Sequence, residues 1–148
     1  MKVRDIMTAS VDSIEAADTI AYAARRMAED DVGCLPVLDG GQLVGIVTDR
    51  DIAVRAVAAS IGADTPVRRI MSERVATCSP GDDIATALAL MSREQVRRMP
   101  VCNERGEVIG IVAIADLAEK DPEKAEVAGA LADICQPSGI HSQSPLFA

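Results

Sequence analysis

The sequence predicts an α/β fold of the mixed α+β kind, in which two tandem β-α-β-β-α repeats pack sheet to sheet with pseudo-twofold symmetry. The main observation behind this prediction is that the chain matches itself at an offset of 64 residues, which indicates a tandem duplication. Ile6-Met7, for example, returns as Ile70-Met71. After one inserted residue the match resumes at an offset of 65, where Gly45-Ile46-Val47 returns as Gly110-Ile111-Val112.

Length and hydrophobic period define the expected organisation. The chain has 148 residues, of which 49% are hydrophobic, so it can bury a core. In both copies the period of apolar residues changes in the same order, from helical to strand spacing. We expect repeat 1 at residues 1–63, repeat 2 at residues 64–120, and a C-terminal helix with a loose tail at residues 121–148. A repeat of about 60 residues is marginal alone, so the two are expected to bury their sheets against each other.

Each repeat is expected to begin with a short strand and a helix. The helical stripes are Ile20, Ala23, Ala24 and Met27 in repeat 1, and Ile84, Ala87, Leu88 and Met91 in repeat 2. Asp18 and Asp82 precede these stripes, where a carboxylate can accept the free N–H groups of a first helical turn. Two strands follow in each repeat, at residues 34–38 and 43–48 and at residues 99–102 and 108–112. Pro36 and Pro100 lack an N–H group, which favours edge positions or strand starts.

A second helix then closes each repeat, beginning near Asp49 and near Ala115. Beyond residue 120 the internal match ends, and Asp121-Pro122-Glu123 is a typical helix start. Val127, Leu131 and Ile134 fall on one face of this expected helix. That face can cover the core of its own chain or pack on a second chain, and the sequence leaves both possibilities open.

The charge and the aromatic content exclude several classes of function. The net charge is −8, and the chain has one Phe, one Tyr and no Trp. It therefore lacks the positive field and the stacking side chains that nucleic-acid binding uses. We expect a cytoplasmic protein without a membrane contact, because no apolar run approaches about 20 residues and the N-terminus does not resemble a secretory signal.

The cysteines and the histidine give a weak signal for a metal, and we expect none. Cys34, Cys78, Cys102 and Cys135 are scattered without a C-x-x-C pair, and the single histidine, His141, lies in the polar tail. The cysteines are expected to be small buried side chains in a reducing compartment, with a redox-sensing pair as the alternative. No nucleophile-and-base pair, P-loop or dinucleotide fingerprint is readable, so we expect no enzymatic activity.

Three segments recur in register in the two copies. They are residues 3–7, 33–37 and 45–51 in repeat 1, and residues 67–71, 96–101 and 110–116 in repeat 2. On these segments the chain resembles the cystathionine-β-synthase (CBS) domain family, in the paired arrangement often called a Bateman module, over about residues 1–120. The family implies an adenosyl ligand, such as AMP, ADP, ATP or S-adenosylmethionine, held in clefts between the repeats. Such a ligand would be regulatory, and no cofactor is required.

The resemblance implies a ligand site around a Gly-x-x-Thr-x-x-Asp pattern, which repeat 1 holds as Gly45, Thr48 and Asp51. The carboxylate of Asp51 would accept hydrogen bonds from the ribose hydroxyls, and Thr48 with nearby N–H groups would suit a phosphate. Glycine would let a neighbouring strand approach closely. The alternative for Thr48 and Asp51 is a helix-capping arrangement. Repeat 2 keeps Asp116 but has Ala113 in place of the hydroxyl residue.

Further site residues follow from the same resemblance. The backbone that would line the adenine base lies at Ser10, Val11 and Asp12 in repeat 1 and at Thr77 and Cys78 in repeat 2. Arg97 and Arg98 would supply a positive group to phosphates, or are a solvated surface pair. Repeat 1 has Gly33-Cys34 at the equivalent place, so the two clefts are not expected to be equivalent.

Two functions of different kinds remain. The first is a non-catalytic adenosyl-ligand sensor that acts on a downstream protein which the sequence does not name. The alternative is a structural or protein-interaction dimerisation module with no bound nucleotide. In both cases we expect a homodimer, because Ala-rich, aromatic-poor helices can pack closely around a two-fold axis and family modules commonly form a disc of four repeats.

Overall fold

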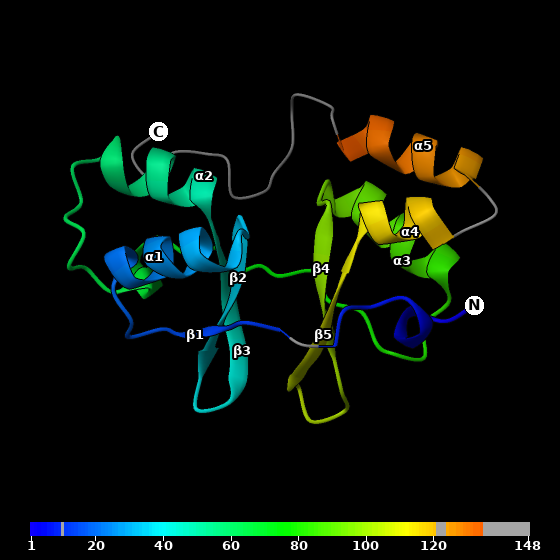
Figure 1. The fold of residues 1–148 in the computed structure, drawn as a ribbon, viewed down its shortest axis with the longest axis horizontal. Helices are drawn as coiled ribbons and strands as arrows, with labels where there is room; N and C mark the ends of the chain where they lie inside the picture. The colour runs from blue at the N-terminus through cyan, green and yellow to red at the C-terminus, as the bar shows by residue number, and fades with distance from the viewer. Residues whose placement is uncertain (10, 121–123, 135–148) are drawn as a thin grey trace. The chain divides into compact units, whose positions relative to one another are not determined.

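The computed structural model describes residues 1–9, 11–120 and 124–134. It has sheets and helices in the mixed arrangement that the sequence predicts, divided into two compact units (Figure 1). One unit comprises Asp12–Val75 and is called the 12–75 unit. The other combines Met1–Val11 with the described residues from Ala76 to Ile134 and is called the 76–134 unit. Within the part of the chain that the structure describes, no helix has the length and apolar character needed to cross a membrane.

The 12–75 unit contains a three-stranded sheet in the order β1-β2-β3. Strand β1 (Ile14–Glu15) runs parallel to β2 (Cys34–Asp39), and β2 is antiparallel to β3 (Gln42–Thr48). Helix α1 (Ile20–Asp30) connects β1 to β2. Strand β3 leads directly into α2 (Asp49–Asp51), which continues as the π-helical segment η2 (Ile52–Val57), and the short 3-10 helix η3 (Val67–Arg69) follows.

The 76–134 unit repeats this plan with three differences. It contains the 3-10 helix η1 (Val3–Asp5), α3 (Ile84–Glu94), the antiparallel pair of β4 (Arg98–Cys102) and β5 (Val108–Ala113), and α4 (Ile114–Lys120). The predicted first strand is reduced to one bridge, in which Cys78 pairs in parallel with Val101. The second closing helix, α4, is an α-helix instead of a π-helix, and an additional helix, α5 (Lys124–Ile134), packs on α3 and α4.

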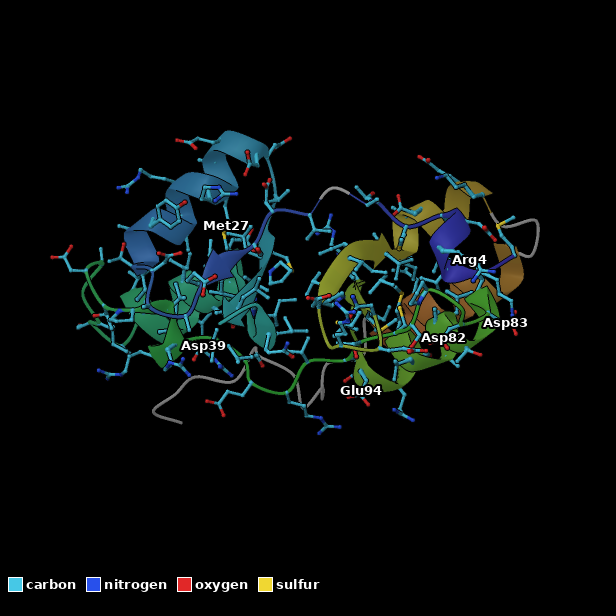
Figure 2. All side chains as sticks on the ribbon, turned by 90° about the horizontal axis from the view of Figure 1, so that it is seen from below. Arg4, Met27, Asp39, Asp82, Asp83 and Glu94 are labelled. Atoms are coloured by element: carbon cyan, nitrogen blue, oxygen red, sulfur yellow. The ribbon has the colours of Figure 1, made fainter. Side chains whose placement is uncertain are left out.

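The leading segment of each repeat belongs to the unit formed by the other repeat. Thr8 forms an antiparallel bridge with Ile111 of β5, and its counterpart Ser72 forms one with Ile46 of β3. Figure 1 shows the dark blue N-terminal segment beside the yellow strand β5. Figure 2 shows the labelled Arg4 near Asp82 and Asp83, and the backbone N–H of Arg4 donates to the carbonyl of Pro80 over 3.0 Å. Each unit is therefore completed by a segment from the start of the other repeat.

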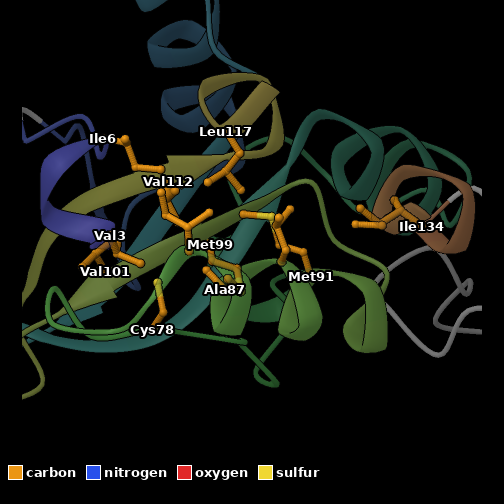
Figure 3. Packing of buried hydrophobic residues seen from close by; sticks show 13 residues of the cluster. Val3, Ile6, Cys78, Ala87, Met91, Met99, Val101, Val112, Leu117 and Ile134 are labelled. Atoms are coloured by element: carbon orange, nitrogen blue, oxygen red, sulfur yellow. The ribbon is translucent and has the colours of Figure 1, made fainter. Parts of the chain in front are cut away.

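Each unit has its own core, formed by one cluster of buried apolar side chains. Figure 3 shows the cluster of the 76–134 unit, in which Val3 and Ile6 of the N-terminal segment pack with Met91, Met99 and Leu117. The matching cluster of the 12–75 unit includes Val67 and Ile70, again from the leading segment of the other repeat. Burying Val3, which is fully inaccessible to solvent, stabilises the fold by about 1.5–3 kcal/mol. The exchanged segments therefore belong to the cores.

The predicted helical stripes are confirmed with one exception. Ile84, Ala87, Leu88 and Met91 of α3 are all buried, as are Ile20, Ala23 and Met27 of α1. Ala24, the counterpart of Leu88, is exposed. Leu88 shares its cluster with Ala130 and Ile134 of α5, so the additional helix accounts for its burial.

Helix α5 covers part of the core of its own unit, which is one of the two possibilities that the sequence left open for its apolar face. Ala130 and Ile134 are buried, and the side-chain amide of Gln95 donates to the backbone carbonyl of Asp133 over 2.9 Å. Leu131, which is expected on the same face, is 41% exposed, so packing of this face on a second chain stays a prediction. The expected start at residues 121–123 and the tail lie outside the described residues.

Two local predictions were wrong. Asp18 and Asp82 accept hydrogen bonds from the preceding backbone at Glu15 and Ser79, both over 2.8 Å, while Thr19 is the residue that caps α1. These carboxylates therefore close the turn before the helix instead of capping its first turn. Pro36 lies inside β2, which has a partner on both sides, and not at an edge. The equivalent Pro100 shows why this is tolerated, since it contributes its carbonyl, which accepts from the Cys78 N–H over 3.2 Å.

Candidate ligand-binding site

The β3–α2 junction, called the repeat-1 junction, is a complete capping box. The hydroxyl of Thr48 accepts from the Asp51 N–H over 3.0 Å, and Asp51 Oδ2 accepts from the Thr48 N–H over 2.9 Å. Two backbone donors at the helix start are thereby satisfied reciprocally. Asp51 is fully buried, and its Oδ1 lies 3.8 Å from Nε of Arg55. The capping alternative is thus present, and it uses the two residues that the resemblance assigns to a ligand.

The β5–α4 junction, called the repeat-2 junction, has half of the same device. Asp116 Oδ2 accepts from the Ala113 N–H over 3.1 Å, but Ala113 has no hydroxyl with which to return the bond. Asp116 is half-buried, in contrast to Asp51. The two junctions share their backbone frame, because Ile114 N–H donates to the Arg97 carbonyl over 2.9 Å as Asp49 N–H donates to the Gly33 carbonyl over 3.0 Å.

The glycines of the two junctions are explained by close approach of the exchanged segments. A Cβ atom on Gly45 would lie 2.5 Å from Met71 Sδ and 3.0 Å from the Ser72 carbonyl oxygen. A Cβ atom on Gly110 would lie 2.6 Å from Met7 Sδ and 3.1 Å from the Thr8 carbonyl oxygen. Real Cβ atoms essentially never approach another atom as closely as these sulfurs, and the carbonyl contacts are tighter than nine in ten real ones. Glycine at both positions therefore allows the close packing, and a larger residue would force the methionine or the backbone to shift.

Arg97 and Arg98 lie at the repeat-2 junction and are both exposed. Arg98 is the first residue of β4 and is paired in register with Ala113, at the start of α4. Cys34 is paired with Thr48 at the equivalent place in repeat 1. The repeat-2 junction therefore carries two arginines and a half-buried carboxylate where the repeat-1 junction carries Gly33, Cys34 and a buried carboxylate.

The residues expected to line the adenine base differ from one another in burial and in their partners. Val11 is half-buried, Asp12 is exposed and ion-paired through Oδ1 with Arg26 Nη2 at 2.9 Å, and Ser10 lies outside the described residues. Thr77 is exposed and Cys78 is buried. The Cys78 N–H and carbonyl are both bonded to β4, through Pro100 and Cys102, so its backbone is part of the sheet.

The structure brings the candidates together in two separate groups. In the 12–75 unit Thr48 and Asp51 bond to each other at the end of the strand that carries Gly45. In the 76–134 unit Asp116 accepts from Ala113, whose register partner is Arg98. The sequence analysis missed Arg55, which approaches Asp51 from the next helical turn. The four-residue spacing of Asp51 and Arg55, which suits an ion pair on a helix, was the signal that could have identified it.

The cysteines give no geometry for metal binding or thiol chemistry in the described ranges. Cys78 is buried and Cys34 and Cys102 are half-buried, and among the described residues no group of three or more His, Cys, Asp or Glu side chains could hold a metal ion. Burial raises the pKa of Cys78 to about 12, with Asp82 as a lesser cause, and burial also raises the pKa of Cys102. A thiol of that pKa is poorly nucleophilic at neutral pH. His141 and Cys135 lie outside the described residues.

Two copies of one α+β unit, each with a carboxylate on the first turn of the helix that follows its last strand, define a paired-repeat module. The family model of the CBS domain matches residues 3–57 and 67–123, and the chain therefore belongs to the CBS domain family. This confirms the resemblance read from the recurring segments. CBS domain-containing protein YhcV of Bacillus subtilis is 36% identical over 89% of this chain and 94% of its own length.

Two solved structures carry the comparison further. Hypoxic Response Protein I, solved with two coordinated zinc ions, is 35% identical with a TM-score of 0.74, covering 80% of this chain and 98% of that one. Its sequence from Mycobacterium tuberculosis, as Hypoxic response protein 1, is 36% identical over 94% of this chain and 97% of its own length. The CBS domain pair of protein MJ0100, in complex with 5-methylthioadenosine and S-adenosyl-L-methionine, is 27% identical with a TM-score of 0.71, covering 80% and 94%.

Proposed function

We propose that this chain is a non-catalytic regulatory module that binds an adenosyl ligand, with the repeat-2 junction as its principal site. The ligand class is supported by the MJ0100 domain pair, which has this fold and was solved with two adenosyl compounds. The observation that carries the proposal is that the half-buried Asp116 accepts from Ala113, the register partner of Arg98, which is exposed together with Arg97. No enzymatic activity and no required cofactor form part of it.

The chemistry of the repeat-2 junction suits a nucleotide. One oxygen of Asp116 is held by the Ala113 N–H, which orients the carboxylate at the helix start. The side chain keeps solvent access, so it can accept hydrogen bonds from the ribose hydroxyls. Arg98, opposite Ala113, and Arg97 beside it provide guanidinium groups whose fork geometry matches phosphate oxygens. We therefore propose a phosphorylated adenosyl ligand, such as AMP or ATP, for this junction.

Isothermal calorimetry with AMP, ATP, adenosine and S-adenosylmethionine tests the proposal. Asp116→Ala should weaken binding by about 1.5–3 kcal/mol, the range for hydrogen bonds to a charged group. Arg97→Ala combined with Arg98→Ala should weaken AMP and ATP much more than adenosine, and added salt should weaken ATP binding to the parent. If the double variant loses affinity for adenosine and for ATP by the same factor, phosphate contact by these arginines is refuted. The cationic S-adenosylmethionine then becomes the better candidate ligand.

The structure also supports the alternative of an interaction module without a nucleotide. At the repeat-1 junction the capping box accounts for Thr48 and Asp51 without any ligand. If none of the four compounds gives binding heat, this second function replaces the first. Under either function we propose a homodimer, and light scattering at micromolar concentration that shows a 15.5 kDa species alone would contradict it.

A further inference from the structure

Arg55 closes the repeat-1 junction from inside the molecule. Its side chain is 13% exposed, and its Nε lies 3.8 Å from Oδ1 of Asp51, which is fully buried. The other carboxylate oxygen, Oδ2, is bonded to the Thr48 N–H. The two oxygens that would serve the ribose hydroxyls therefore face the capping backbone on one side and a guanidinium group on the other.

The same guanidinium group also reaches the exchanged segment. Arg55 Nη1 lies 3.4 Å from the carbonyl oxygens of Ile70 and Met71, two residues of the segment that completes the 12–75 unit. Arginine suits this place because it has five donors in a planar fork, whereas lysine has one compact ammonium group. The wider turn of the π-helical segment η2 carries Arg55. Such irregular turns are frequent at functional positions.

Repeat 2 provides an internal comparison. The residue equivalent to Arg55 at the offset of 65 is Lys120, the last residue of α4, and it is exposed. Its equivalent carboxylate, Asp116, is half-buried instead of buried. The buried carboxylate therefore occurs with the inward-pointing arginine, and the more accessible carboxylate occurs with the exposed lysine.

We propose that Arg55 is a specificity-determining residue that occupies the repeat-1 junction in place of a ligand, by competing with ribose hydroxyls for Asp51. This inference rests on the proposed function. A ligand that enters the junction must displace Arg55 from Asp51, which spends part of its binding energy. Without Arg55, the buried carboxylate would lose its counter-charge, and hydroxyl donors would then gain the interaction that Arg55 made.

The test is Arg55→Met in an Asp116→Ala background, so that remaining binding reports on repeat 1. Methionine keeps the unbranched apolar stem of the side chain and removes its charge and donors. We expect the urea midpoint of the ligand-free protein to fall while adenosine binds about tenfold more tightly than to the Asp116→Ala parent. If Arg55 serves folding alone, the variant should have a lower urea midpoint and an unchanged affinity for adenosine. Arg55→Lys should give a smaller gain, and Lys120→Met, the matched control, should leave the affinity within about twofold.

Unchanged or weaker adenosine binding by the Arg55→Met variant would overturn the inference, while binding by the unmodified chain would leave the proposed function intact. If neither the variants nor the unmodified chain bind adenosine, AMP, ATP or S-adenosylmethionine, both the inference and the proposed function are overturned. If Arg55→Met does not fold, Arg55→Gln replaces it, because glutamine keeps a polar side chain with N–H donors and removes the charge facing Asp51. The same tighter binding is then expected, and its absence is equally decisive.

Discussion

The repeat-1 and repeat-2 junctions share a backbone and differ in what they do with one carboxylate. Asp51 is buried inside a complete capping box and faces Arg55, while Asp116 is half-buried in half a box beside two arginines. In the first the carboxylate is used by the fold, and in the second it remains accessible. The comparison teaches that keeping the motif residues after a duplication does not keep their role, since neighbouring residues decide whether a carboxylate serves the chain or a ligand.

Removing the two carboxylates should expose this difference most strongly. Asp51→Ala should destabilise the ligand-free protein by about 2–3 kcal/mol, because it removes a cap and leaves the largely buried Arg55 without that carboxylate. Asp116→Ala should cost less than about 1 kcal/mol, since it removes one hydrogen bond at a partly exposed site. Urea unfolding of both variants gives the comparison. Equal losses of stability would mean that the junctions are energetically equivalent.

Alanine at the two glycines should show where the junctions are the same. Gly45→Ala and Gly110→Ala should each destabilise by about 1–3 kcal/mol, because the added methyl group overlaps a methionine sulfur and a backbone carbonyl. Gly62→Ala is the control, since a Cβ atom there meets nothing within 4 Å, and it should change stability by less than about 0.5 kcal/mol. A neutral result at either glycine would show that its exchanged segment moves aside at little cost.

Exchanging the hydroxyl between the junctions should sharpen the comparison with the smallest effects. Thr48→Ala removes the hydroxyl that accepts from Asp51 and should cost about 1 kcal/mol. Ala113→Thr supplies the missing acceptor in repeat 2 and should stabilise by about 0.5–1 kcal/mol. Thermal unfolding of the single variants and of the double variant checks both signs. A loss of stability in Ala113→Thr would indicate that the half box is required by its surroundings.

Much of the fold was accessible from the sequence because the apolar period repeats. Both helical stripes were predicted from the spacing of residues such as Ile20 and Met27, with one exception at Ala24. The strands were predicted from their shorter period, except that the first strand of repeat 2 is reduced to the bridge at Cys78. The exchange of leading segments was not predictable in this way. The internal match shows that Thr8 and Ser72 are equivalent, but it does not show which strand each one pairs with. Pairing within the same repeat and pairing with the other repeat would both satisfy the same sequence pattern.

The motif residues of the candidate site were predicted from the sequence, but the difference in burial between the two repeats was not. The sequence favoured a ligand site in repeat 1, because Thr48 and Asp51 complete the motif there. Ligand binding by these two residues remains a prediction. Burial, however, depends on contacts that sequence spacing does not report, and here it distinguishes Asp51 from Asp116. The π-helical turn that carries Arg55 was equally out of reach, because its residues fit an ordinary α-helical period.

The exchanged leading segments also set an order for folding during synthesis. The described residues of the 12–75 unit have all emerged once the ribosome has released the chain to Val75. The segment with Val3 and Ile6 leaves the ribosome before the 12–75 unit, yet these residues find their partners, such as Met91, Met99 and Leu117, only after repeat 2 has emerged. They are thus made before one whole unit and buried after it, and their apolar surface stays available to chaperones in the interval.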